Sequence, residues 1–386
     1  MTTLTSRGLE DVVACTSAIC AIDGQRGRLQ YGGYDIDELV QAGFEEVCYL
    51  LWHGELPDRA QLEALRAALD AVELPEAVVT LLRGLPRDAH PLTALRTAIS
   101  ALGALDPEAE DGSPEANTRK AVRLVAQTPR IVAAWQRLRN GLEPVMPEPG
   151  DSIAQGFLRG LSGKAPSADA VRAIDMALVL HAEHELNAST FAVRVAAATE
   201  TDLHAAITAA CAVLKGPKHG GANEDVPVML DEIGTPAAAE AWVKAKLAWR
   251  ETLPVAERQQ IKARFSGFGH RVYKVDDPRA AHLRRMAQRL AEGDPTVARR
   301  LAIAERVREL MAAEKGLKVN VDFYSALVYQ ALGIPSDLNT SIFAIARMAG
   351  WTAHALEQYA DNRLIRPRAE YIGSSERRFM PLAARG

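Results

Sequence analysis

Apolar residues recur at helical spacing through most of the chain. Within residues 58–72, Leu62, Leu65 and Leu69 are three or four positions apart, and Asp58 stands where the N-cap of a helix is expected. The same spacing predicts further helices at 119–138, 168–183, 202–214, 280–292, 296–315, 322–332 and 340–360. Helices therefore make up most of the predicted structure.

Strand signals are confined to the N-terminal region. In residues 19–34, Asp23-Gly24 separates two short segments, which is typical of a small β-hairpin. Residues 103–118 and 141–152 are rich in proline, glycine and acidic side chains, and this composition predicts surface loops. No repeat of fixed period is present. The sequence predicts an all-α fold with a small N-terminal hairpin, and it supports neither a Rossmann unit nor a parallel sheet.

The size and charge of the chain narrow the classes of function. At 386 residues it is longer than one core usually supports, so we expect one large domain or a large domain with a smaller partner. The 48% hydrophobic and 24% charged content is ordinary for a soluble globular protein, and the net charge of -4 gives no general attraction to nucleic acid or to an anionic membrane. A phosphate-bearing ligand would need a local basic cluster.

Signals for export are not evident. The N-terminal sequence MTTLTSRGLEDVV lacks a basic region followed by an apolar stretch, and no run of about 18 apolar residues occurs. Cys15, Cys20, Cys48 and Cys211 show no CxxC spacing and are interpreted as reduced thiols. We therefore expect a cytoplasmic protein that is neither secreted nor membrane-spanning.

Three separate segments carry candidate chemistry. In the first, 213–225, an apolar run breaks at a Gly-Pro pair, and His219 follows with two glycines behind it. Residues 223–225 are typical of a helix start, so the helix dipole would disfavour a charged imidazole at His219 and leave a neutral hydrogen-bond donor. A turn histidine satisfied by the backbone is the alternative.

The second segment, 267–279, is a basic loop in an acidic protein. It places His270 beside two glycines and continues with Arg271, Lys274 and Arg279. Exposed backbone groups and cationic side chains are suited to bind phosphates or carboxylates. The segment contains neither the GxxxxGK[ST] nor the GxGxxG nucleotide-binding motif. A solvated charged loop is the alternative.

The third segment, 318–326, sets Asp322 among Val321, Phe323 and Tyr324 at the beginning of an apolar helix. An apolar setting raises the pKa of a carboxyl group and strengthens it as a base. A plain helix N-cap is the alternative.

Together these segments resemble the citrate synthase family. GFGHRVYKVDDPR is similar to the family signature, GPKHGGAN to its first-histidine segment and NVDFYS to its catalytic aspartate segment. Further similar segments occur in order along nearly the whole chain, and they are LQYGGYDI, HPLTALRTAIS, HAEHELNAST, FAIARMAGW and NRLIRPRAEYIG. The sequence departs from common family residues at Gly32, Lys218, Val319 and Ala326, none of which is a matched catalytic position.

The resemblance implies a reaction without metal or cofactor. The family condenses acetyl-CoA with oxaloacetate and hydrolyses the citryl thioester to citrate and CoA. By similarity, Asp322 takes a proton from the acetyl methyl group, His219 hydrogen-bonds the thioester oxygen, and His270 polarises and protonates the ketone of oxaloacetate. An obligate homodimer is implied as well, because the residue matching Arg366 reaches into the neighbouring site.

The resemblance also implies the ligand contacts and the domains. The matched oxaloacetate-binding residues are His184, Arg279, Arg347 and Arg366. The matched CoA-binding residues are Phe265, Gly267, Phe268, Gly269, Arg271, Lys274, Lys318 and Asn320. Residues 1–221 and 327–386 would form a large helical domain with the dimer contact and the oxaloacetate site. Residues 222–326 would form a small helical domain that binds CoA and closes over the oxaloacetate site.

Three alternatives remain open at this stage. A 2-methylcitrate synthase would use propionyl-CoA on the same scaffold, and one methylene changes binding by only about 1–3 kcal/mol. A metal-dependent hydrolase is suggested by the run from His181 to Glu185, but its spacing matches neither HExxH nor HxxEH, so no metal site is expected. An inactive helical scaffold would have little reason to keep the three catalytic positions together with the arginines.

Overall fold

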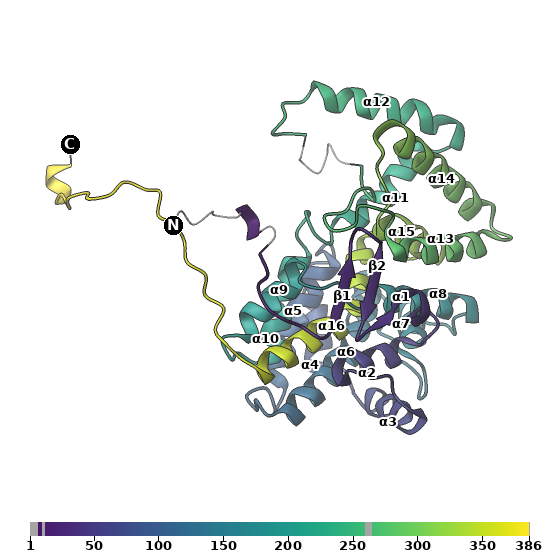
Figure 1. The fold of residues 1–386 in the computed structure, drawn as a ribbon. Helices are drawn as coiled ribbons and strands as arrows, with labels where there is room; N and C mark the ends of the chain where they lie inside the picture. The colour runs from purple at the N-terminus through teal and green to yellow at the C-terminus, as the bar shows by residue number, and fades with distance from the viewer. Residues whose placement is uncertain (1–6, 10–11, 259–264, 386) are drawn as a thin grey trace.

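The computed structural model of the chain describes residues 7–9, 12–258 and 265–385. Over these residues the fold consists of α-helices and one small antiparallel sheet, which confirms the all-α prediction (Figure 1). The helices up to residue 221 are α1 (Ile36–Leu39), α2 (Phe44–His53), α3 (Arg59–Asp70), α4 (Glu76–Arg83), α5 (Pro91–Leu105), α6 (Pro114–Arg139), α7 (Ile153–Ser162), α8 (Ala168–His181), α9 (Ala188–Ala197) and α10 (Leu203–Leu214). Those that follow are α11 (Ala222–Ile233), α12 (Ala239–Thr252), α13 (Pro278–Ala291), α14 (Pro295–Lys315), α15 (Val321–Ala331) and α16 (Asn339–Ala360).

The predicted hairpin is present and carries a third strand. Strands β1 (Cys20–Asp23), β2 (Arg28–Tyr31) and β3 (Tyr34–Asp35) form an antiparallel sheet in that order. The turn spans four residues rather than two, because Asp23 is still paired with Arg28 at the end of the ladder. The Asp23 carboxylate accepts hydrogen bonds from the backbone of Gln25 and Arg26 at 3.0 and 2.9 Å, and this local bonding fixes the turn.

Helix boundaries follow the capping residues. Asp58 is the N-cap of α3, and its carboxylate accepts a hydrogen bond from the backbone N–H of Gln61 at 2.8 Å. The prediction of a loop over 103–118 is wrong at both ends, since α5 continues to Leu105 and α6 begins at Pro114. Ser113 caps α6 and Pro114 is its first residue, so the proline there starts a helix instead of marking a loop.

Helix α16 is the central element of the core. It packs against α2, α6, α8, α9 and α10, and every residue from Asn339 to Ala355 is buried. In Figure 1 it runs in yellow through the middle of the helical body. A helix that is buried on all sides is a rigid support, and it carries Arg347.

Helices α11 to α15 gather at one end of the molecule (Figure 1). Among them α13 packs on α14 and α15, α12 on α14, and α11 on α15, while α11 also touches α16 and α13 also touches α8. This group covers the predicted small domain, 222–326. Helix α15 continues unbroken across residue 326, so it belongs to both sides of the predicted boundary.

The C-terminal segment, residues 361–385, extends away from the helical body (Figure 1). Its apolar side chains are exposed, with Ile372 at 93% and Phe379 at 83%. Within the described part of the chain, every helix is too short or too polar to cross a membrane.

Candidate active site

The segments around His184 and His270 meet beside α16. The rings of His184 and His270 lie 5.2 Å apart between centroids, and Tyr273 contacts both rings. The Tyr273 hydroxyl is 3.2 Å from His184 Nε2. Burial, with the charges of Arg279 and Arg347, holds the pKa of His184 well below its usual range, so this histidine is neutral. Tyr273 was not a predicted site residue, although it lies inside the basic loop.

Two buried arginines face this cluster in different ways. Arg279 forms a bidentate pair with Asp277, at 2.9 Å from Nε and 2.7 Å from Nη2, and both side chains are at most 2% exposed. Arg347 donates from Nε to the carbonyl of His181 at 2.9 Å, and its Nη1 is buried without a protein partner among the described residues. An unpartnered buried guanidinium nitrogen is a strong donor for an anionic ligand.

Asp277 links the basic loop to the aspartate segment. It is the N-cap of α13, and its carboxylate also accepts a hydrogen bond from the backbone N–H of Val321 at 3.2 Å. Burial alone would raise the pKa of Asp277, but the Arg279 guanidinium and its hydrogen bonds hold that pKa below its usual value. The carboxylate is therefore ionised and fixes Arg279 next to the start of α15.

His219 lies in the turn immediately before α11, as predicted. Its Nε2 is 2.8 Å from Ser189 Oγ, and the indole N–H of Trp351 donates to the same oxygen at 3.2 Å. Burial lowers the pKa of His219 to about 4, with Arg347 as the second cause. The predicted neutral imidazole therefore results from burial and a nearby cation, which differ from the helix dipole on which the prediction rested.

His270 has a defined tautomer. Its Nδ1 accepts hydrogen bonds from the backbone N–H groups of Val272 and Tyr273 at 3.0 and 3.2 Å. Backbone N–H groups can only donate, so Nδ1 carries no proton and the neutral ring is protonated at Nε2. Burial lowers the pKa of His270 to about 4, and Arg279 adds to this effect. His270 therefore presents a single N–H donor to the site.

Asp322 is the second residue of α15, and its carboxyl group is desolvated. Burial raises its pKa to about 6, while Arg279 and the Asn223 amide act in the opposite direction. Asn223 donates to the carboxylate at 3.1 Å, and Asn339 donates to the Asn223 side-chain oxygen at 3.1 Å. The helix N-cap is Asn320, so the N-cap interpretation of Asp322 is wrong. Asn223 was not predicted, although it is part of the GPKHGGAN motif.

A cavity of about 340 Å³ opens beside His270. Four predicted CoA-binding residues line it, and two unpredicted residues, Arg250 and Leu317, complete its wall. The lining consists of Arg250, Phe265, Phe268, Gly269, His270, Arg271 and Leu317.

The remaining predicted CoA-binding residues shape or flank this cavity. Gly269 donates from its backbone to Lys318 at 2.8 Å, and Asn320 donates to Gly267 at 2.9 Å, so the two predicted CoA segments pair with each other. The side chains of Lys274 and Lys318 are exposed. Arg366 lies apart from the site, exposed in the C-terminal segment.

The run from His181 to Glu185 suggested a metal-dependent hydrolase, but its two histidines contact different parts of the chain. His181 Nδ1 lies 2.6 Å from the carbonyl of Ala177, whereas His184 faces Tyr273. Over the ranges that the structure describes, no group of three histidine, cysteine or acidic side chains is placed to hold a metal ion.

The chain is similar to known proteins over almost its full length. Residues 8–368 match the family described as citrate synthase, C-terminal domain. Citrate synthase 2 of Bacillus subtilis is 49% identical, with 98% of this chain and 99% of that protein covered. Citrate synthase of Haloferax volcanii is 44% identical over 98% of both chains. A 2-methylcitrate synthase 2 of Corynebacterium glutamicum is 38% identical over 100% of this chain and 99% of that one.

Solved structures agree with these sequence relationships. Citrate synthase from Thermotoga maritima superposes with a TM-score of 0.85 at 37% identity, covering 98% of this chain and 99% of that chain. The Thermoplasma acidophilum enzyme, solved as a ternary complex with carboxymethyl coenzyme A and oxaloacetate, gives a TM-score of 0.90 at 33% identity over 98% of both chains.

The fold and the site define a condensing enzyme of the acyltransferase type. The chain belongs to the citrate synthase family.

Proposed function

We propose that this enzyme condenses acetyl-CoA with oxaloacetate and hydrolyses the resulting citryl-CoA to citrate and CoA. The observation that carries the proposal is the desolvated Asp322 carboxyl group, whose pKa is raised to about 6. Asp322 lies at the start of α15, where Asp277 accepts a hydrogen bond from the backbone of Val321 and pairs with Arg279. A base of that strength suits removal of a proton next to a thioester carbonyl, and the residues just before its helix pair with Gly269, the neighbour of His270.

The proposed steps use the His270 tautomer that the geometry defines. Asp322 takes a proton from the acetyl methyl group while His219 donates a hydrogen bond to the thioester oxygen as negative charge develops there. The methyl carbon then bonds to the ketone carbon of oxaloacetate, and His270 gives its Nε2 proton to the ketone oxygen. Water finally cleaves the thioester and releases CoA.

Oxaloacetate would be held through its two carboxylates. His184, Arg279 and Arg347 lie together around the site. The buried Nη1 of Arg347, which has no partner among the described residues, is suited to one carboxylate. The fourth predicted ligand, Arg366, would come from a second copy of the chain, since it lies in the extended C-terminal segment. We therefore propose a homodimer in which the two copies complete each other's sites, acting in the cytoplasm.

CoA would occupy the cavity beside His270, which places an acyl group near the histidine. Phe265, Phe268 and Gly269 would contact the nucleotide part, with Arg271, Lys274 and Lys318 near the phosphates. We propose that residues 222–326 close over oxaloacetate before acetyl-CoA reacts and exclude water from the site. The reaction needs neither a metal nor a redox cofactor, because Asp322 and the histidines supply the proton transfers.

A second candidate is 2-methylcitrate synthase activity with propionyl-CoA. It is favoured by the relatives that carry this name at 38% and 39% identity, close to several relatives named citrate synthase. The relative at 49% identity is named citrate synthase 2, so we propose acetyl-CoA as the preferred substrate.

Product identification tests the proposal. Purified enzyme is incubated with acetyl-CoA and oxaloacetate, thiol release is followed by absorbance, and the acid product is identified by mass spectrometry. We expect citrate and CoA in equal amounts, with unchanged rates in excess EDTA. An enzyme that forms no citrate, or that needs added metal, would contradict the proposal.

A further inference from the structure

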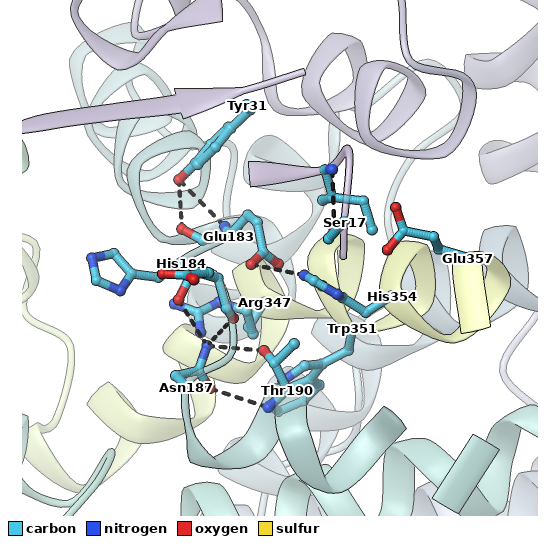
Figure 2. Close-up of polar contacts among 12 residues, drawn as sticks. Ser17, Tyr31, Glu183, His184, Asn187, Thr190, Arg347, Trp351, His354 and Glu357 are labelled. Atoms are coloured by element: carbon cyan, nitrogen blue, oxygen red, sulfur yellow. Dashed lines mark hydrogen bonds and ion pairs between the residues drawn. The ribbon is translucent and has the colours of Figure 1, made fainter. Parts of the chain in front are cut away.

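A buried carboxylate that the mechanism does not use lies directly before His184. Glu183 is 0% exposed, and its Oε1 is 3.1 Å from His354 Nε2 on α16 (Figure 2). The other carboxylate oxygen points at Gly350 so closely that any side chain at position 350 would overlap it. The Glu183 side chain is thus enclosed by α16, and a buried charge of this kind needs a specific reason.

The hydrogen-bond donors fix how His354 binds Glu183. Arg194 Nε donates to His354 Nδ1 at 2.9 Å, and an arginine nitrogen can only donate. His354 therefore carries its single proton on Nε2 and donates it to Glu183 Oε1. The three side chains form one directed chain, Arg194 to His354 to Glu183, which we call the buried relay.

The outer end of the buried relay is anchored to two distant segments. Arg194 also donates to Gln358 at 3.3 Å and pairs with Glu357 near the end of α16. Glu357 in turn accepts a hydrogen bond from the backbone N–H of Ala18 at 2.8 Å. The relay therefore spans from the segment before β1 to the loop that carries His184.

The inner end of the relay lies against the keto-acid side of the site. The Tyr31 hydroxyl donates to the Glu183 carbonyl at 2.9 Å, so both the backbone and the side chain of Glu183 are fixed (Figure 2). Arg347, Gly350 and His354 are three and four positions apart on α16 and share one face of that helix. Glu183 supplies negative charge close to the buried guanidinium of Arg347.

We propose that Glu183 and His354 are positioning residues for oxaloacetate. The pair holds the 182–184 loop against α16, which places His184 and Arg347 at a fixed separation and compensates the buried charge of Arg347. This inference rests on the proposed function, because it assigns the keto acid to His184 and Arg347.

The test compares the KM for oxaloacetate with the KM for acetyl-CoA in variants of the relay. His354→Phe keeps a buried ring but removes both hydrogen bonds of the relay. We expect at least a tenfold rise in KM for oxaloacetate, with KM for acetyl-CoA within twofold of wild type. His354→Gln restores one donor toward Glu183 and should recover most of the loss. Glu183→Gln keeps an acceptor for His354 but removes the charge, and it should raise KM for oxaloacetate several-fold.

Thr352→Val provides the matched control. Thr352 is equally buried on α16, and its hydroxyl accepts the Trp52 indole N–H at 2.8 Å outside the site. This variant should shift Tm without changing either KM. Folded His354→Phe with an unchanged KM for oxaloacetate, or with both KM values raised equally, would overturn the proposal.

If His354→Phe does not fold, the test uses Glu183→Gln instead. An unchanged KM for oxaloacetate in Glu183→Gln would then overturn the proposal. Binding of oxaloacetate alone is measured by calorimetry for every variant. Wild-type enzyme that binds oxaloacetate but makes no citrate would refute the proposed function, while unchanged binding in the variants would refute only the relay.

Discussion

At the scale of single residues, burial shifts the pKa of the aspartate and the pKa values of the histidines of this site in opposite directions. It raises the pKa of Asp322 to about 6 and lowers the pKa of His219 and His270 to about 4. Near pH 7 the aspartate is therefore ionised and a stronger base than usual, and both histidines are neutral. One physical cause thus prepares all three groups for their proposed roles.

Replacing Asp322 with asparagine should separate chemistry from keto-acid binding. Asp322→Asn keeps the size of the side chain but removes the base, so kcat should fall by at least about 10²-fold. The Kd for oxaloacetate, measured by calorimetry, should stay within twofold. The control Asp169→Asn removes an exposed carboxylate paired with Arg289 and should change neither value. Near wild-type turnover in Asp322→Asn would show that another group is the base.

The pH dependence of the reaction should report the raised pKa of Asp322. Protonation below about pH 6 removes the base, so kcat/KM for acetyl-CoA should fall tenfold per pH unit on the acid side. His219 and His270 stay neutral until about pH 4 and should add no further change between pH 5 and 7. A profile that is flat down to pH 5 would contradict this assignment.

Sequence motifs indicate the candidate catalytic groups, whereas the side chains that contact them carry no such signal. His219, His270 and Asp322 stand in recognisable motifs, whereas Ser189 and Glu183 act through contacts with residues 30 and 171 positions away. Side chains brought together over such separations leave no local periodic signal. The lowered pKa of His219 was predicted from the helix dipole, because the burial and the distant Arg347 that lower it leave no local signal in the sequence.

At the scale of elements, a close approach of two loops shapes the cavity beside His270, where we propose that CoA binds. Gly267 has a φ of 83°, and a Cβ atom there would lie 2.6 Å from the ring of Phe323 on α15. The loop can therefore pair with residues 318–320 only if position 267 has no side chain.

Gly267→Ala should push this loop away from α15 and impair CoA binding. We expect kcat/KM for acetyl-CoA to fall at least tenfold while the Kd for oxaloacetate changes little. Gly293→Ala is the matched control, because Gly293 has a φ of 84° but no neighbour within 4 Å. It should cost about 1–2 kcal/mol of stability and leave catalysis unchanged. An equal fall in kcat/KM for acetyl-CoA in both variants would indicate that backbone strain alone causes the loss.

Helices with a sustained apolar spacing were predictable, and short helices were less so. The spacing of apolar residues located α3, α14 and α16 within one or two residues. The helix predicted at 119–138 also runs unbroken through Pro129. The surrounding part of α6 is buried, and its packing compensates for the hydrogen bond that the proline cannot make. Helix α4 has only eight residues and α9 only ten, so neither showed a full helical repeat.

At the scale of the whole molecule, the exposed C-terminal segment bears on the proposed homodimer. Residues 361–385 present Leu364, Tyr371, Ile372 and Phe379 to solvent, which is costly for an isolated chain. Arg366 lies in the same segment, apart from the site that it is predicted to complete.

Hybrid dimers test whether Arg366 acts in the neighbouring site. Arg366→Ala and Asp322→Asn chains, each nearly inactive alone, are co-expressed with different tags and purified as mixtures. One of the two sites in each hybrid is intact, so random pairing should restore about a quarter of wild-type activity. Mixing Asp322→Asn with His270→Ala should restore none, because both lesions lie in the chain's own site. An absence of restoration in verified Arg366 hybrids would contradict a shared site.

The most direct measurement is the ratio of kcat/KM for acetyl-CoA and propionyl-CoA with saturating oxaloacetate, using Asp322→Asn as the blank. We predict that acetyl-CoA is preferred by at least about tenfold, which is the order expected when one methylene is excluded from a fitted pocket. A preference for propionyl-CoA, or no condensation with either thioester, would contradict the proposed function.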